Sequence, residues 1–189
     1  MRRVRLPPAV TFALFAASPL EAEMSPPLMP THDVDITYSV TRERGPPIRE
    51  RVRWLASRGL ERVDGPDKST TIFDRNKGEI TLLTPESRTY RKLVSAAGGP
   101  IEAEQGGQLT RGGEAEVAGL RCTEWAWAAD IDETRAVCAT PDGVLLRLTI
   151  GGKTMIQALS VRYGNQPPDL FDVPRGYTPA LAPEGSPGP

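Results

Sequence analysis

The stretch Asp33-Val-Asp-Ile-Thr-Tyr-Ser-Val-Thr41 (DVDITYSVT) decides the fold class of this chain. Apolar and polar side chains alternate along it, and one side of the chain carries Val34, Ile36, Tyr38 and Val40. Successive side chains of a strand point to opposite faces of a sheet, so a period of two predicts a strand with one buried face. Antiparallel sheets commonly show this pattern, because one face packs while the other meets water.

The alternation continues downstream of a Gly-Pro-Pro turn. In residues 48–57 the inner side carries Ile48, Val52 and Trp54, and arginines alternate with them on the outer side. Further short runs, separated by turn signals, follow at 60–63, 70–73, 79–83, 89–94, 120–128, 134–139, 144–150 and 154–163. Regular spacing of short strands is typical of an all-β domain. Only residues 93–104 have the character of a short helix, so we expect a large antiparallel sheet curled over one apolar face.

The two ends of the chain differ from this middle part. The N-terminus has a basic start, the nine-residue apolar run 9–17 and a small-residue segment, which is the layout of a secretory signal peptide. A membrane anchor is the alternative, but a spanning helix needs about 20 apolar residues. The last residues are rich in Pro, Gly and Ala and cannot bury enough surface to fold. We therefore expect a signal peptide at 1–22, a linker at 23–32, one domain at 33–178 and a disordered tail at 179–189.

The charge balance excludes two classes of partner. The chain has 23 Lys and Arg against 24 Asp and Glu, for a net charge of −1 and a pI near 5.9. No overall basic field is available to attract nucleic acid or to hold the protein on an anionic membrane. We expect no nucleic-acid partner and no transmembrane segment.

The two cysteines, Cys122 and Cys138, fit an exported protein with one disulfide. In a hairpin that turns about Asp130, residues whose numbers sum to 260 lie opposite each other, which brings the two cysteines within disulfide reach. The alternatives are a redox-active pair or half of a metal site. Redox motifs keep two intervening residues, and two thiolates without a nearby histidine make a poor zinc site. The sequence therefore predicts a structural disulfide, no metal and no cofactor.

Residues suited to catalysis are few. The single histidine, His32, falls in the linker, and there is no Gly-x-Ser-x-Gly elbow. The acidic residues Asp130, Asp132 and Glu133 lack the calcium-loop pattern and are predicted to serve a turn. A pair of carboxylates for glycoside chemistry stays open, although nothing singles one out. We expect that the protein is not an enzyme.

Two sets of residues are candidates for binding. The first is Arg49, Arg51 and Arg53, which share one face of a strand and are suited to an anion or a protein partner. The alternative is that these arginines pair with Asp33 and Asp35 on the neighbouring strand.

The second set consists of the three tryptophans. Trp125 and Trp127 share one face of their strand, and the same register rule places Arg135 and Glu133 opposite them. With Trp54 they are candidates for the lining of an apolar ligand groove, because aromatic side chains dominate such cavities. The alternative is that they belong to the core.

Five short segments of the chain resemble a known family. They are 33–38 (DVDITY), 52–54 (VRW), 72–75 (IFDR), 117–122 (VAGLRC) and 171–177 (FDVPRGY). Together they resemble the lipoprotein-carrier-like (LolA-like) superfamily of periplasmic envelope proteins, above all its members of unknown function. The resemblance covers about 33–178. It implies a strongly curved half-barrel of about 8–11 antiparallel strands, with at most one or two short helices and a helical element over the concave side.

The resemblance also implies a function. The carriers bind acyl chains in their concavity and have no catalytic residues, while related members act as sensors or protein-binding modules. This chain departs from the carriers because it lacks their long N-terminal helix and adds a hairpin disulfide and a Pro-rich tail. We expect a periplasmic domain that binds an apolar or lipid-like ligand. The alternative is a structural or protein-interaction module of the envelope.

Overall fold

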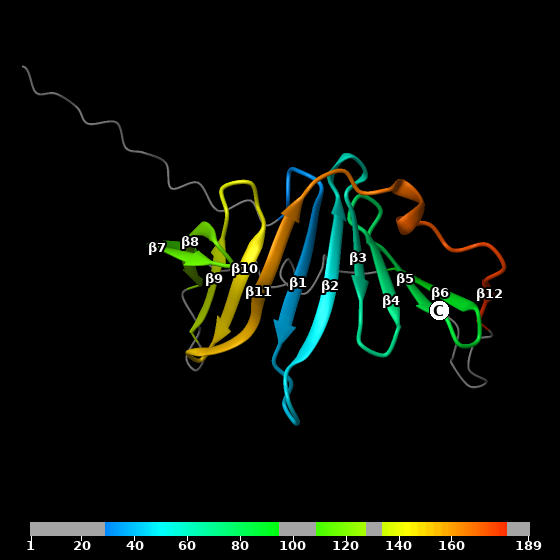
Figure 1. Ribbon diagram of the computed structural model, residues 1–189, viewed down its shortest axis with the longest axis horizontal. Helices are drawn as coiled ribbons and strands as arrows, with labels where there is room; N and C mark the ends of the chain where they lie inside the picture. Colours follow the sequence, from blue (N-terminus) through cyan, green and yellow to red (C-terminus); the bar gives the residue numbers. More distant parts are fainter. Residues whose placement is uncertain (1–28, 95–108, 128–133, 181–189) are drawn as a thin grey trace, which may run out of the picture.

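A single curved sheet forms the protein (Figure 1). The structure is a computed structural model that describes residues 29–94, 109–127 and 134–180. The strands are β1 (Val34–Val40), β2 (Ile48–Leu55), β3 (Leu60–Asp64), β4 (Thr70–Asp74), β5 (Glu79–Thr84), β6 (Thr89–Val94), β7 (Leu109–Val117), β8 (Leu120–Trp127), β9 (Arg135–Ala139), β10 (Leu145–Ile150), β11 (Lys153–Tyr163) and β12 (Thr178–Pro179). Two 3-10 turns, η1 (Ala56–Arg58) and η2 (Pro168–Phe171), are the helical elements of the described residues.

The predicted fold class is confirmed. The strands lie side by side in the order β12-β6-β5-β4-β3-β2-β1-β11-β10-β9-β8-β7. Neighbouring strands are antiparallel throughout, apart from the two-residue β12, which pairs in parallel with β6. With this short strand the described residues form twelve strands, one above the expected range of about 8–11. Within the described ranges no helix is long and apolar enough to cross a membrane.

Tight turns connect several of these strands, as the glycines of the sequence suggest. Ala118 and Gly119 both have positive φ values, 53° and 76°, between the paired residues Val117 and Leu120. Such values at both central positions define the primed turn that matches the twist of a hairpin. Residues 151–152, both glycine, repeat this geometry between β10 and β11.

The sheet curves around the face that carries Tyr38 and Trp54. Phe73 on β4 and Trp127 on β8 lie seven strands apart in the sheet order, yet both line one cavity. In a flat sheet seven strand spacings would separate them by about 34 Å. The face that holds the cavity is therefore the concave face, and the opposite face is convex.

The disulfide lies near the β7 end of the sheet, where β7 also contacts β11. Cys122 and Cys138 are bonded as predicted, with their Cα atoms 5.4 Å apart. The predicted register is wrong, because Glu124 faces Cys138 and Trp127 faces Arg135, so the numbers of opposed residues sum to 262. The cysteines are therefore diagonal rather than directly opposite. A shift of two residues keeps every side chain on its own face, which is why the bond still forms.

The C-terminal segment crosses the convex face rather than the concave one. Phe171 of η2 packs against Leu55 and Leu60, which point away from the Trp54 side of the sheet. The guanidinium of Arg62 donates a hydrogen bond of 2.6 Å to the carbonyl of Leu170. The resemblance implied a helical element over the concave side, and the segment 95–104, where the sequence predicts a short helix, lies outside the described residues, whereas η2 lies on the convex face. The position of η2 follows from Leu55 on β2 and Leu60 on β3, which lie opposite each other and form an apolar pair on the convex face.

Some expectations fall outside the described residues. These are the signal peptide at 1–22, most of the linker, the helical segment 95–104, the acidic residues 130, 132 and 133, and the tail from residue 181. The first tail residues belong to the fold, since β12 ends at Pro179 and the Ala180 amide donates to the Tyr90 carbonyl at 2.8 Å.

Candidate functional site

A cavity of about 490 Å³ lies on the concave face. Its walls come from β1 to β4 and from β8 to β11, so the curvature of the sheet creates it. Most of its lining is apolar or aromatic: Ile36, Tyr38, Val40, Val52, Trp54, Val63, Phe73, Trp127, Leu145, Leu148, Ile150 and Ile156. The volume lies within the range of about 300–1,000 Å³ that is usual for small-molecule sites.

The alternation seen in the sequence places these side chains. Ile36 on β1 faces Val52 on β2, and Val52 in turn faces Val63 on β3. Directly opposed residues of antiparallel strands point to the same face, so the apolar stripes of three strands meet side by side. The local pattern thus makes the wall, and the curl of the sheet closes it into a cavity.

Tyr38 fixes the two halves of the cavity to each other. Its hydroxyl donates a hydrogen bond of 2.6 Å to the carbonyl of Leu145 on β10, and its side chain is buried. Burial raises the pKa of Tyr38 well above its ordinary value, so the hydroxyl remains a donor at neutral pH. The sequence marked Tyr38 only as one member of an apolar stripe, and its partner lies 107 residues away.

The three tryptophans are not equivalent. Trp54 and Trp127 line the cavity, whereas Trp125 is buried opposite Val137 and is not part of the lining. The indole nitrogens of Trp54 and Trp127 are buried and have no hydrogen-bond partner among the described residues. Buried donors without an acceptor are rare in folded proteins, and each one calls for an explanation.

Four side chains that carry a charge at neutral pH in solution also line the cavity: Glu50, Glu61, Arg75 and Arg135. Glu61 forms an ion pair with Arg75, whose guanidinium lies 4.9 Å from the centre of the Phe73 ring. Arg135 has an interaction of its own. Glu50 makes no hydrogen bond or ion pair with any described residue. Burial raises the pKa of its carboxyl, and the nearby charge of Asp67 adds to that effect.

The convex face of the same strands is closed by ion pairs. Arg51 donates two hydrogen bonds to the carboxylate of Asp35, at 2.9 and 2.6 Å, and Arg162 donates a third at 3.0 Å. The hydrogen bond from Arg51 is the main reason why the pKa of Asp35 lies below its usual value. Burial of Asp35, which is only 8% exposed, opposes this effect without cancelling it.

A second acid extends this network. Arg53 and Arg62 each donate to Asp64 at 2.9 Å, and Thr70 donates at 2.8 Å. Burial on its own would raise the pKa of Asp64, but the hydrogen bonds from Arg62 and Thr70 and the neighbouring charges lower it overall.

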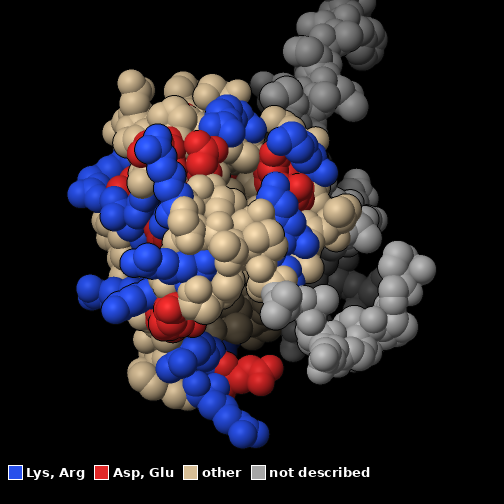
Figure 2. Space-filling model, turned by 90° about the vertical axis from the view of Figure 1, so that its right-hand side faces the viewer, with Lys and Arg blue, Asp and Glu red and all other residues tan. Residues whose placement is uncertain are grey.

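The structure places the three candidate arginines differently. Arg51 and Arg53 are engaged by Asp35 and Asp64, whereas Arg49 lies opposite Ser39 and makes no ion pair within the described part of the chain. Asp33, the other partner that the sequence suggested, instead accepts hydrogen bonds from the backbone amides of residues 56 and 166. Figure 2 shows the β6–β12 end of the molecule, where further Lys and Arg side chains surround an area without charged residues.

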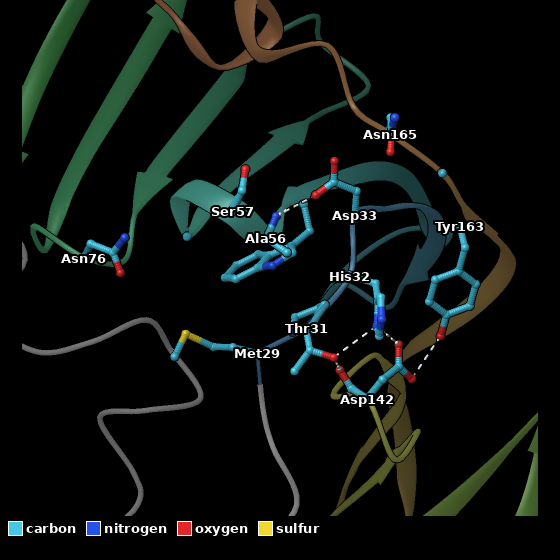
Figure 3. Close-up of a pocket in the computed structure, with 14 residues that line it drawn as sticks. Met29, Thr31, His32, Asp33, Ala56, Ser57, Asn76, Asp142, Tyr163 and Asn165 are labelled. Atoms are coloured by element: carbon cyan, nitrogen blue, oxygen red, sulfur yellow. Dashed lines mark hydrogen bonds and ion pairs between the residues drawn. The ribbon is translucent and has the colours of Figure 1, made fainter.

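A second cavity of about 1270 Å³ lies beside the N-terminal residues 29–33 (Figure 3). His32 and Tyr163 both approach Asp142, with the His32 Nδ1 atom 3.7 Å from one carboxylate oxygen and the tyrosine hydroxyl 3.1 Å from the other. The backbone amide of Thr31 donates to the carbonyl of Asp142 at 2.9 Å. The predicted linker is therefore docked on the turn between β9 and β10 from residue 31 onward, a contact that no local pattern could reveal.

The geometry around His32 is not that of a catalytic triad. A triad histidine uses one ring nitrogen for the acid and the other for the nucleophile. Here the same Nδ1 atom faces both Asp142 and the hydroxyl of Thr31, which is 3.1 Å away. Within the described ranges no three His, Cys, Asp or Glu residues are grouped closely enough to hold a metal ion.

Comparison with known proteins gives a fold but no family. No protein-family model and no curated protein sequence matches the chain. Among solved structures, an uncharacterized conserved protein from Thermus thermophilus is similar with a TM-score of 0.56 and 12% identity, over 79% of this chain and 90% of that one. MucB is similar with a TM-score of 0.54 and 15% identity, over 78% of this chain and 59% of MucB.

A complex of Pseudomonas aeruginosa MucA and MucB gives a TM-score of 0.54 and 17% identity, over 77% of this chain and 56% of the matched one. This chain therefore spans less than two thirds of the MucB chains that it resembles. At these identities the likeness concerns the fold alone.

Proposed function

We propose that this protein is an exported, periplasmic binding module of the LolA-like type that holds an apolar or lipid-like ligand in its concave cavity. The observation that carries the proposal is the cavity itself, which has apolar walls drawn from seven strands and a volume of about 490 Å³. Transfer of an apolar ligand from water into such a site is favourable roughly in proportion to the apolar area buried.

The tryptophans support this proposal. A packed core seldom leaves two indole N–H groups buried without an acceptor, because each costs about 1–3 kcal/mol. A lipid-like molecule in the cavity that carries an oxygen acceptor, such as a hydroxyl or an ester group, offers a reason for both. The ligand then covers the rings of Trp54 and Trp127.

Two features support export. Residues 1–22 have the basic, apolar and small-residue order of a signal peptide, and the only two cysteines form a disulfide. Disulfides persist in oxidising compartments such as the periplasm and are rare in the cytosol.

The test fills the cavity without touching the convex face. In the Val52→Phe variant a larger ring occupies space between Ile36 and Val63, so we expect it to bind an apolar fluorescent probe at least about tenfold more weakly than the wild type. The matched control is Arg49→Gln, on the same strand but on the opposite face. Equal binding by wild type and Val52→Phe would place the probe elsewhere and contradict the proposal.

A protein-interaction module is the second candidate. It is favoured by one observation, the likeness in fold to MucB, which has been solved in complex with MucA. Under this alternative the protein would purify with a second polypeptide, and the cavity-filling change would leave that association intact.

A further inference from the structure

Glu50 interrupts an otherwise apolar stripe of the cavity wall. The inward-facing residues of β2 are Ile48, Glu50, Val52 and Trp54, and Glu50 lies directly opposite Tyr38. An apolar residue at this position would continue the wall. The packing of the sheet therefore gives no reason for a carboxyl group at this position.

The other charges of the cavity are already engaged. Glu61 provides the sharpest contrast, because it lines the same cavity from the neighbouring strand and is held by Arg75. Arg75 also covers the Phe73 ring, and Arg135 has an interaction of its own. Glu50, in contrast, has no hydrogen bond or ion pair with a described residue.

A half-buried carboxylate without a partner is costly, because it loses hydration and gains no replacement. The raised pKa of Glu50 reflects that cost. The charge of Asp67 acts in the same direction. A cationic group beside Glu50 would stabilise its carboxylate, whereas a second anion would destabilise it further.

We infer that Glu50 is a specificity-determining residue, which makes the cavity select apolar ligands that carry a protonated amine. The inference rests on the proposed function, since it names the polar group of the ligand that the apolar walls hold. An ammonium group adds the attraction between opposite charges to its hydrogen bond with the carboxylate, whereas a hydroxyl group on the same chain offers the hydrogen bond alone. The hydroxyl group is therefore a weaker partner, and a carboxylate is repelled.

The experiment compares three ligands of equal chain length at pH 7 and physiological ionic strength. Dodecylamine, dodecanol and dodecanoate each displace an apolar fluorescent probe from the mature protein, below their aggregation limits. We expect the amine to bind about tenfold more tightly than the alcohol and the carboxylate to bind most weakly. Glu50→Gln removes the preference for the amine and leaves the affinity for the alcohol unchanged, while Glu50→Lys reverses the order of amine and carboxylate.

The control is Glu86→Gln, which removes a carboxylate from the turn between β5 and β6, away from the cavity lining. It should keep the wild-type preference. If all three ligands bind the wild type equally, the inference fails while the proposed function stands. If Glu50→Gln keeps the preference for the amine, Glu50 is not its source. If none of the three displaces the probe or binds directly, the proposed function fails as well.

Discussion

The two faces of strands β1 to β3 differ in how their charged and polar groups are paired. On the convex face the buried Asp35 and the half-buried Asp64 each meet at least two guanidinium groups, so their charges are compensated within the fold. On the concave face Glu50 and the Trp54 indole nitrogen have no hydrogen-bond partner among the described residues. The comparison shows acids that are paired within the fold on the convex face, and a carboxyl group and an indole N–H without partners among the described residues on the concave face. Four predictions test this contrast.

The largest effect is expected on the concave face. Trp54 is 5% exposed, belongs to the main core cluster and also lines the cavity. Trp54→Ala should lower the free energy of unfolding by about 3–5 kcal/mol, because removal of a large buried aromatic side chain loses its transfer energy and leaves a void. Urea unfolding measures the change. A loss below about 1 kcal/mol would show that the ring does not support the wall.

On the convex face, Asp35→Asn should cost about 1–2 kcal/mol. The variant keeps the shape of the side chain but leaves Arg51 and Arg162 without their acid, and both arginines are partly exposed to water, which limits the cost. Arg49→Gln is the control and should change stability by less than about 0.5 kcal/mol. Equal effects of the two changes would mean that the ion pairs do not stabilise this face.

The link between the two halves of the cavity gives a smaller effect. Tyr38→Phe removes the hydroxyl that donates to the Leu145 carbonyl and should lower stability by about 1 kcal/mol. The ligand-free sheet should also show faster amide exchange in β10 beside the lost bond. Unchanged exchange there would contradict the role of Tyr38 as a tie between β1 and β10.

The smallest effect is the pH dependence of the Asp35→Asn penalty. The pKa of folded Asp35 lies below its ordinary value of 3.8, so its stabilising contribution is complete above that value and is lost as the pH falls through the folded pKa. The wild type and Asp35→Asn should therefore differ fully at pH 6 and converge below about pH 4. Urea midpoints measured across this range check the sign. A difference that grows on acidification would contradict it.

Ten of the twelve strands in the described residues could be predicted, because alternation is local information, whereas β7 and the two-residue β12 were missed. The pattern of 33–41 predicts β1 to within one residue at each end, and the turn glycines predict the hairpins. The disulfide was also predictable, since a two-residue error in register leaves both cysteines on one face. That error arose because nothing in the residues between β8 and β9 marks the centre of the turn.

The cavity could not be predicted to the same degree. Trp54 and Trp127 were candidates for its lining, but Trp125, which has the same pattern, packs outside the lining. The difference depends on how far the sheet curls at each point, which is a long-range property. The same is true of Glu50, because only the curvature of the sheet shows that its side chain lines a largely apolar cavity.

The ion pairs of the convex face were harder to predict for another reason. The choice between an anion-binding face and ion pairs depended on which acids lie beside the arginines. Asp35 lies on β1, the strand that precedes the arginine-bearing β2 in the sequence and pairs with it. Asp64, however, reaches Arg53 from β3, and Arg162 reaches Asp35 from β11. These partners become visible only when the order of strands in the sheet is known.

The central claim is that the concave cavity holds an apolar molecule in the cell. Native mass spectrometry of the mature protein, purified from a periplasmic fraction without detergent, tests it most directly when an organic extract of the same sample is analysed in parallel. The account predicts a population carrying an extra small-molecule mass, which is released on denaturation, is recovered in the extract and is absent from Val52→Phe. A wild-type protein that shows only its own mass, with nothing specific in the extract, would contradict it.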